Sequence, residues 1–223
     1  MKSIAILLNG QIKNDTRVIR TIKTLSEHYR IDLFYVKGNP VVDKDIFDGE
    51  VQIFRLNRND NLLNKVIQHS MFCRSYLGFV DIVLETKIDY SLIWANDLPC
   101  LLPAYRISKL LGSKLIYDSH EIYLETLNQF FPLKSPYPKK VIYSLAKWIM
   151  KKHGHYVERR LIHKVDLFIT VNKSLADYFK GLYHIKKVFV LVNYPSKNFA
   201  NNSSVDSKSL FGWNSNSILF LIK

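Results

Sequence analysis

Short, continuous apolar runs recur along this chain, and between them lie longer stretches in which apolar residues recur at every third or fourth position. Runs of the first kind predict strands that are buried on both faces of a sheet, and stretches of the second kind predict helices with one apolar side. The predicted strands are residues 3–8, 31–36, 51–56, 91–95, 114–118, 166–171 and 187–192. The predicted helices are residues 16–28, 62–86, 101–111, 139–163 and 174–182.

This order of elements predicts the fold class and the domains. Strands that alternate with helices pair in parallel through right-handed crossovers, so we expect an α/β fold with a doubly wound, Rossmann-like parallel sheet in residues 1–195. Residues 196–216 are rich in Asn and Ser, which is typical of a linker. Residues 217–223 contain the apolar run ILFLIK, which starts a second domain or adds an edge strand to the first sheet. We favour the start of a second domain.

The composition limits the compartment and the partners. Neither Cys73 nor Cys100 has the spacing of a disulfide framework or a metal site. Because no apolar run has the length of a signal peptide or of a membrane-spanning helix, we expect a cytoplasmic protein. The net charge of +13 predicts an anionic partner. Nucleic acid is not the partner that we expect, since the sequence has no zinc-finger spacing, no aromatic RNA-binding motif and no basic tail.

Polar residues follow the predicted strands at their carboxyl ends, where open α/β sheets bind ligands. The run Asp118-Ser119-His120-Glu121, for example, comes directly after a buried strand. Amides, carboxylates and hydroxyls that converge on one sheet edge suit a polyhydroxylated ligand such as a sugar. The candidate site residues are Asn9, Gly10, Asp15, Arg17, Asn96, Asp97, Asp118, Ser119, His120, Glu121, Asn172 and Asn193.

Several candidates have a structural interpretation as well. Asp15 and Asp97 could each cap a helix, and for Ser174 capping is the interpretation that we favour. Arg17 and Arg20 could be solvated charges on an exposed helix face. Gly10 permits a tight turn before a helix N-terminus, but the glycine-rich motifs that bind dinucleotides or nucleoside triphosphates do not occur in the sequence. His120 lies too close in sequence to Asp118 and Glu121 for the three to ligate a metal easily.

Three segments of the chain carry a resemblance to a known family. They are residues 14–36, 93–125 and 159–195, and their most specific motifs are N-D-x-R-V-x-R, Y-D-S-H-E and D-x-x-I-T-V-N-x-S-x-A. In these motifs the chain resembles the N-terminal domain of family 4 glycosyltransferases, which have the two-Rossmann architecture called GT-B. The resemblance covers nearly the whole chain up to Pro195.

The resemblance implies transfer of a sugar from a nucleotide-sugar donor to a glycan or lipid-linked acceptor, with retention of configuration and without a metal or other cofactor. It places His120 near the transferred sugar and Asp97 on the acceptor side. The loop from Asn9 to Arg17 would close over the phosphates of the donor. This chain would then be mainly the acceptor-binding half, and residues 217–223 would begin the donor-binding domain.

The chain departs from the family pattern in one respect. The pair of glutamates with seven residues between them, which grips the donor in the family's C-terminal domain, does not occur in this sequence. We therefore expect these residues alone to be inactive in sugar transfer, because the leaving diphosphate would lack the positive groups that stabilise it. The alternatives are the non-catalytic half of a split glycosyltransferase that binds a partner chain, and a fragment of a nucleotide-sugar epimerase.

Residues 137–164 combine lysines and arginines with apolar side chains that include Trp148. A basic amphipathic helix of this kind suits an anionic membrane surface, which would make the protein peripheral at the inner membrane face. The alternative is an ordinary surface helix with its apolar side on the core, and this is the interpretation that we favour for Trp148.

Overall fold

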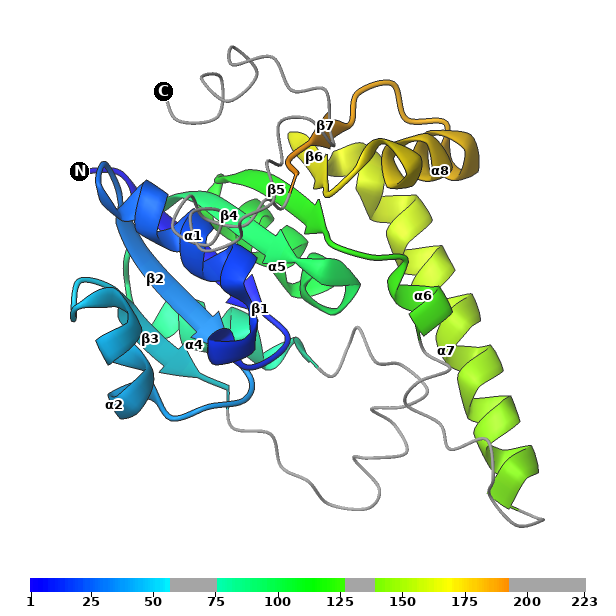
Figure 1. Ribbon diagram of the computed structural model, residues 1–223, viewed down its shortest axis with the longest axis horizontal. Helices are drawn as coiled ribbons and strands as arrows, with labels where there is room; N and C mark the ends of the chain where they lie inside the picture. The colour runs from blue at the N-terminus through cyan, green and yellow to red at the C-terminus, as the bar shows by residue number, and fades with distance from the viewer. Residues whose placement is uncertain (57–75, 127–138, 193–223) are drawn as a thin grey trace, which may run out of the picture. The chain divides into compact units, whose positions relative to one another are not determined.

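The computed structural model describes residues 1–56, 76–126 and 139–192, which belong to one compact unit, Met1–Val192. Seven parallel strands form one sheet in the order β3-β2-β1-β4-β5-β6-β7 (Figure 1). The doubly wound α/β fold is thus confirmed. The strands are β1 (Ser3–Leu8), β2 (Arg30–Tyr35), β3 (Gln52–Arg55), β4 (Tyr90–Asn96), β5 (Lys114–Ser119), β6 (Leu167–Thr170) and β7 (Phe189–Val190).

Helices cover both faces of this sheet. Residues that alternate along each strand divide between two apolar clusters, as in β1, where Ala5 and Leu7 face one cluster while Ile4 and Ile6 face the other. Helices α4, α5, α7 and α8 contribute to the first cluster, and α1 contributes to the second. The helices are α1 (Thr16–Ser26), α2 (Pro40–Asp43), α4 (Gly78–Glu85), α5 (Asp97–Leu111), α6 (Tyr123–Thr126), α7 (Lys139–Leu161) and α8 (Lys173–Tyr183), with short 3-10 turns η1 (Ile12–Asn14), η2 (Lys44–Phe47) and η5 (Ile162–Lys164).

All the predicted strands are present, and β7 differs most because it is shorter than residues 187–192. Helix α5 begins at Asp97 rather than at residue 101, since Pro99 lies in its first turn, where a backbone N–H has no partner within the helix. Of the predicted helix 62–86, the structure describes residues 76–86, and the α-helix begins at Gly78. The linker 196–216 and the strand in 217–223 lie outside the described residues, as does Cys73, whereas Cys100 is buried as expected.

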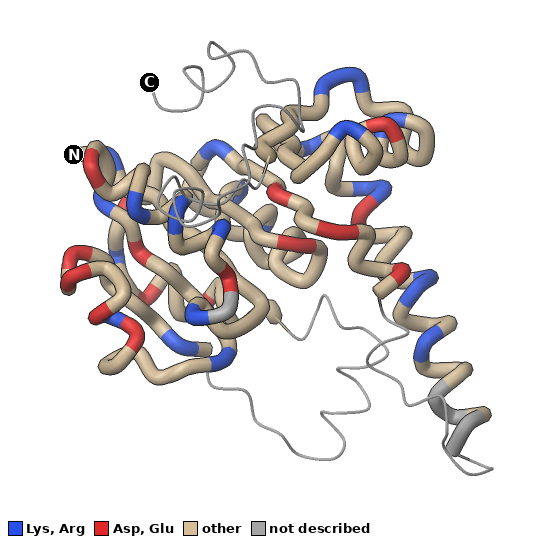
Figure 2. The backbone as a smooth tube through the Cα atoms, in the orientation of Figure 1, with Lys and Arg blue, Asp and Glu red and all other residues tan. Residues whose placement is uncertain are grey.

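Helix α7 turns only part of its apolar surface to the core. Met150, Val157 and Leu161 are buried in the first cluster. Trp148, however, is 59% exposed, so the interpretation that it packs on the core is wrong. The figures show α7 as a long helix with basic segments along its length (Figure 2).

The direction of strand order reverses between β1 and β4. From β1 the chain builds the sheet outward through β2 and β3, and it then returns to place β4 on the other side of β1. The carboxyl ends of these neighbouring strands therefore open onto one crevice between helices of opposite faces.

Candidate active site

The crevice at this reversal collects the polar residues that follow β1, β4 and β5. Asn96 at the end of β4 is in register with Asp118 of β5, so the two strands end side by side. The N-terminus of α1 supplies Asp15 and Arg17 from the other side. The structure thus brings five of the predicted residues together, namely Asp15, Arg17, Asp97, Asp118 and His120.

Arg17 and Asp118 form a buried ion pair, in which Arg17 Nη2 lies 2.5 Å from Asp118 Oδ1. Arg17 is 6% exposed and Asp118 is 1% exposed, so the interpretation of Arg17 as a solvated charge is wrong. Arg17 Nη1 also donates to the carbonyl of Leu191, 3.1 Å away, just after β7. Arg20, one turn further along α1, donates its Nε to the Thr16 carbonyl on the helix surface.

His120 lies between two carboxylates at the mouth of the crevice. Its Nδ1 is 3.9 Å from Asp15 Oδ2, and its Nε2 is 3.5 Å from Asp118 Oδ2. The second distance is that of an ion pair and is too long for a good hydrogen bond. Among the described residues, the buried His120 Nε2 and Arg17 Nε have no hydrogen-bond partner. The hydrogen-bonding capacity of these two buried atoms is thus not satisfied within the described structure.

The neighbouring charges of Arg17, Asp118 and His120 shift the pKa values of Asp118 and His120 towards their ionised forms. Burial by itself would raise the pKa of Asp118, but His120 and Arg17 outweigh that effect and hold the pKa of the carboxyl below its usual value. Burial would lower the pKa of His120, yet the neighbouring Asp118 carboxylate and the charge of Asp97 raise it above its ordinary value. His120 is therefore suited to donate a hydrogen bond, or a proton, rather than to accept a proton from a hydroxyl.

Asp97 holds the loop that carries His120. Its Oδ1 accepts a hydrogen bond of 3.0 Å from the backbone N–H of His120, so it does not cap the helix that it begins. Its φ is +59°, a left-handed conformation that costs free energy for any residue except glycine. Burial raises the pKa of Asp97 to about 6, although His120 acts in the opposite direction. Such strain and such a pKa are typical of functional sites.

Other candidates are engaged in holding the backbone. The Asn96 amide donates to the Leu7 carbonyl at 3.0 Å, and the Ser119 hydroxyl donates to the Glu121 carbonyl at 3.0 Å. The side chain of Asp15 accepts a hydrogen bond from Val18 N and caps α1, which confirms that prediction. Asn172 caps α8, so the cap predicted at Ser174 is wrong by two residues.

The remaining candidates lie at the rim of the crevice or outside the described residues. The Asn9 amide donates to the Tyr123 hydroxyl at 3.3 Å, and the exposed Glu121 accepts from Thr126. Gly10 is not in the left-handed region, so the turn there does not require a glycine. Asn193 lies outside the described residues.

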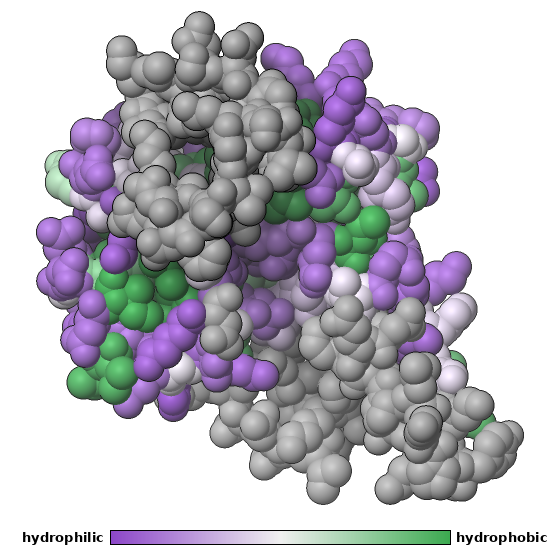
Figure 3. Space-filling model, in the orientation of Figure 1, coloured by the Kyte–Doolittle hydropathy of each residue, from purple (hydrophilic) through white to green (hydrophobic). Residues whose placement is uncertain are grey.

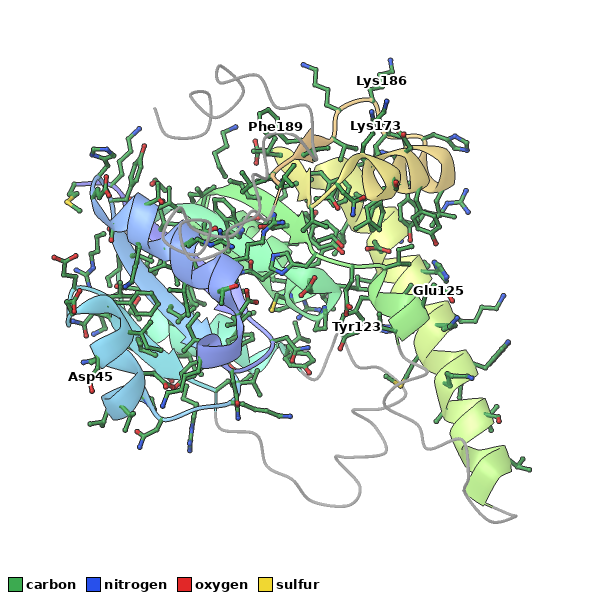
Figure 4. The ribbon with its side chains drawn as sticks, viewed as in Figure 1. Asp45, Tyr123, Glu125, Lys173, Lys186 and Phe189 are labelled. Carbon is green, nitrogen blue, oxygen red and sulfur yellow. The ribbon has the colours of Figure 1, made fainter. Side chains whose placement is uncertain are left out.

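Sequence reasoning missed two groups that support the site. The first is the short helix α6, which carries Tyr123 and Glu125 (Figure 4). The Tyr123 hydroxyl accepts the hydrogen bond from Asn9, and Glu125 Oε2 lies 2.8 Å from Lys151 Nζ of α7. In the core, Tyr117 donates a hydrogen bond of 2.6 Å to buried Glu158, which fixes the residue next to Asp118. In the sequence Glu158 stands next to Arg159 and Arg160, as a surface glutamate would, so no local signal indicated this second group.

No protein-family profile and no curated protein sequence matches the chain. Solved structures do match it. UGT2 of Phytolacca americana, in complex with UDP-2-fluoro-glucose and pterostilbene, is 10% identical with a TM-score of 0.55, and the match covers 90% of this chain and 56% of that one. A segment of sucrose-phosphate synthase from Thermosynechococcus elongatus is 12% identical with a TM-score of 0.55, over 90% of this chain and 93% of the segment.

Anabaena HepE in complex with UDP is 15% identical with a TM-score of 0.51, over 100% of this chain and 50% of HepE. The chain therefore spans about half the length of UGT2 and of HepE. These neighbours are glycosyltransferases of the GT-B architecture, and at such low identity the likeness establishes a shared fold: a Rossmann-like α/β domain of the kind from which GT-B glycosyltransferases are built.

Proposed function

We propose that the chain is a glycosyltransferase domain of the hexosyltransferase type. In this proposal it is the acceptor-binding half of a retaining enzyme that moves a sugar from a nucleotide sugar to a glycan or lipid-linked acceptor in polysaccharide synthesis. The observation that carries the proposal is the crevice at the strand reversal, where Arg17, Asp118 and His120 present buried polar groups in a fold shared with UDP-binding transferases.

The side chains of this crevice are better suited to forming hydrogen bonds with a sugar hydroxyl than to removing its proton. Because the pKa of His120 is raised, we expect its imidazole to act as a hydrogen-bond donor to a hydroxyl oxygen. The carboxylates of Asp15 and Asp97 can accept hydrogen bonds from neighbouring hydroxyls. This combination positions a polyhydroxylated ligand but supplies little positive charge for a departing diphosphate.

A donor-binding domain is therefore part of the proposal, on the same polypeptide or on a partner chain. The resemblance to family 4 glycosyltransferases supports retention of configuration and the assignment to the acceptor side. A split transferase remains the first alternative. An epimerase fragment is the second, and it would act on a nucleotide sugar without any acceptor.

We further propose that the protein works in the cytoplasm, against the anionic inner face of a membrane. The support lies on α7, where Leu145, Trp148 and Tyr156 are 57%, 59% and 59% exposed on one helical side. The Lys152 ammonium lies 5.9 Å from the centre of the Trp148 ring, which gives this side a basic and aromatic character suited to an interface. In the described part of the chain, no helix combines the length and the hydropathy needed to cross a membrane.

The test measures sugar transfer directly. The protein is purified from its native cells with any chain that co-purifies, and is incubated with radiolabelled nucleotide sugars and with oligosaccharide or lipid-linked acceptors. We expect label to reach an acceptor with retained configuration, and His120→Ala to reduce transfer by at least about a hundredfold. The isolated 223-residue chain should transfer no label.

Each alternative gives a different result. Transfer with inverted configuration would contradict the retaining mechanism, and transfer by the isolated chain would contradict the need for a second domain. Conversion of the nucleotide sugar without an acceptor would favour the epimerase. If no preparation moves label and no oligosaccharide binds, the proposed function is wrong.

A further inference from the structure

A basic hollow lies at the amino edge of the sheet, the edge opposite to the candidate active site. Its volume is about 340 Å³, and it is lined by the connection from α5 to β5 and by residues before β6, which come much later in the sequence. The residues that define it are Lys109 and Gly112 at the end of α5, Ser113 and Lys114 at the start of β5, and Lys164 and Asp166 before β6.

The hollow has an excess of positive charge. Three lysines and one aspartate line it, so its formal charge is 3 − 1 = +2. The aspartate is already engaged, because Asp166 Oδ1 lies 2.8 Å from Lys114 Nζ and its Oδ2 accepts from Leu115 N. In residues 1–56, 76–126 and 139–192, no carboxylate oxygen lies within 4.0 Å of the ammonium groups of Lys109 and Lys164.

Both of these ammonium groups are held by the same ring. Lys164 Nζ lies 5.2 Å and Lys109 Nζ lies 5.8 Å from the centre of the Tyr105 ring. Lys164 Nζ also donates a hydrogen bond of 3.5 Å to the Tyr105 hydroxyl, so one of its three N–H groups is engaged and the other two can reach another acceptor. Tyr105 therefore gathers two cations beside the hollow without neutralising them.

A hydroxyl donor lies beside these cations. The Ser113 Oγ is buried and has no hydrogen-bond partner among the described residues. Gly112 turns the chain with a φ of +68°, and a side chain at this position would meet nothing within 4 Å. The space beside Gly112 is thus open.

The ordinary explanation for lysines at this place is the C-terminus of α5, whose carbonyls favour positive charge. Within the backbone, the Ser108 carbonyl accepts the N–H groups of both Gly112 and Ser113. No hydrogen bond joins Lys109 or Lys164 to a carbonyl of α5 in the described structure. The helix terminus can therefore favour these charges, but it does not engage the N–H donors of the two side chains.

We propose that the hollow binds a phosphate group, carried either by a phospholipid headgroup or by a free phosphorylated compound. A phosphate dianion matches the charge of +2 and accepts several hydrogen bonds at once. Lys109, Lys164 and Ser113 would supply the donors. Helix α7 runs through η5 to Lys164, so a lipid headgroup in the hollow would lie at the end of the helix that exposes Trp148.

The first arm of the test uses sodium phosphate and the full 223-residue chain. Backbone NMR shifts of Gly112 and Ser113 should change with phosphate and not with equal ionic strength of sodium chloride. The variant Lys109→Gln/Lys164→Gln should weaken this binding roughly tenfold or more, because two charge-assisted hydrogen bonds are lost. The control Lys23→Gln/Lys180→Gln has the same charge change on α1 and α8 and should bind phosphate as the wild type does.

The second arm uses vesicles of phosphatidylcholine with and without phosphatidic acid. If the hollow variant loses co-sedimentation and the charge-matched control does not, the headgroup is the source of the phosphate. If the two variants sediment equally and phosphate binding still distinguishes them, the ligand is a free phosphorylated compound. Equal behaviour of both variants in both arms would overturn the proposal. None of these measurements involves glycosyl transfer, so they test the hollow independently of the proposed function.

Discussion

Replacing Arg17 by methionine would remove the closest cation from a buried carboxylate and keep much of the side-chain volume. Arg17 Nη2 lies 2.5 Å from Asp118 Oδ1, and the two side chains are 7% and 1% exposed. In Arg17→Met the Asp118 carboxylate would keep His120 as its cation, with Nε2 3.5 Å from the other carboxylate oxygen. The Leu191 carbonyl would also lose the hydrogen bond that Arg17 donates to it.

Removing one partner of a buried ion pair costs about 3–5 kcal/mol. Because His120, whose pKa is raised, stays beside the carboxylate, we expect the lower end of that range, about 3 kcal/mol. A domain has a total stability of about 5–15 kcal/mol, so the loss is large enough to measure accurately. The matched control is Lys23→Met on the exposed side of α1, which should change stability by less than about 0.5 kcal/mol.

The assay is urea-induced unfolding at pH 7, followed by circular dichroism, for wild type, Arg17→Met, Asp118→Asn and the double variant. The loss of unfolding free energy in the double variant should be smaller than the sum of the two single losses by about 1–3 kcal/mol. The reason is that Asp118→Asn removes the buried carboxylate that Arg17→Met leaves without its closest cation. Additive effects would refute the reasoning, and so would equal stabilities of Arg17→Met and the Lys23→Met control.

The pH dependence gives a second check on the same pair. The folded-state pKa of Asp118 is lowered, so its contribution to stability is present above the unfolded pKa of about 4 and is lost as the pH falls through the folded value. The difference between wild type and Arg17→Met should therefore shrink as the pH is lowered below about 4. A difference that stays constant down to pH 2 would point to lost packing rather than lost charge.

Three further predictions concern residues around the site and its supporting loops. In Gly38→Ala, a Cβ would lie 2.4 Å from a carboxylate oxygen and from a tyrosine ring carbon, so we expect a loss of roughly 2–4 kcal/mol in urea unfolding. Gly49→Ala, which has positive φ but open space, should lose about 1 kcal/mol, and equal losses would contradict the steric argument. Tyr117→Phe removes a 2.6 Å hydrogen bond from buried Glu158 and should cost about 1–3 kcal/mol, whereas an unchanged urea midpoint would show that this bond contributes nothing. Burial raises the pKa of Asp97 to about 6. The ionised carboxylate therefore lowers the free energy of unfolding above that pH, and this loss disappears as the pH falls from 6 towards 4. Asp97→Asn should therefore be more stable than wild type at pH 7 and should lack that pH dependence in thermal unfolding, and the same slope in both proteins would exclude Asp97 as its source.

Continuous apolar runs made the sheet predictable from the sequence, because a strand buried on both faces needs apolar side chains at every position. For this reason, strand β1 (Ser3–Leu8) has the same bounds in the structure as in the prediction. The start of α5 is harder to predict, because Pro99 resembles a helix breaker although the first turn of a helix tolerates a proline. The four residues of α2 are too few to show a period, so pattern analysis could not find this helix.

The position of the candidate site was predictable, but its contacts were not. Asp118 and His120 are candidates from the sequence because polar residues follow several strands and converge on one edge of the sheet, where open α/β sheets bind ligands. The burial of Arg17 depends on Asp118, 101 residues further along the chain, and on Leu191, 174 residues away. A local sequence pattern contains no information about such distant pairs. For the same reason, the engagement of Asn96 and Ser119 with the backbone became visible only in three dimensions.

The strand reversal beside the site also has a consequence for the order of folding. Strand β1 pairs with β2 across a short separation, Ser3 opposite Arg30, but with β4 across a much longer one, Ser3 opposite Tyr90. Closing the longer loop costs more chain entropy and slows the search for the correct pairing. We therefore expect β1, β2 and β3 to associate early and the junction with β4 to form near the end of folding. Arg17 and Asp118 lie on opposite sides of that junction, so the crevice would be among the last parts of the molecule to take shape.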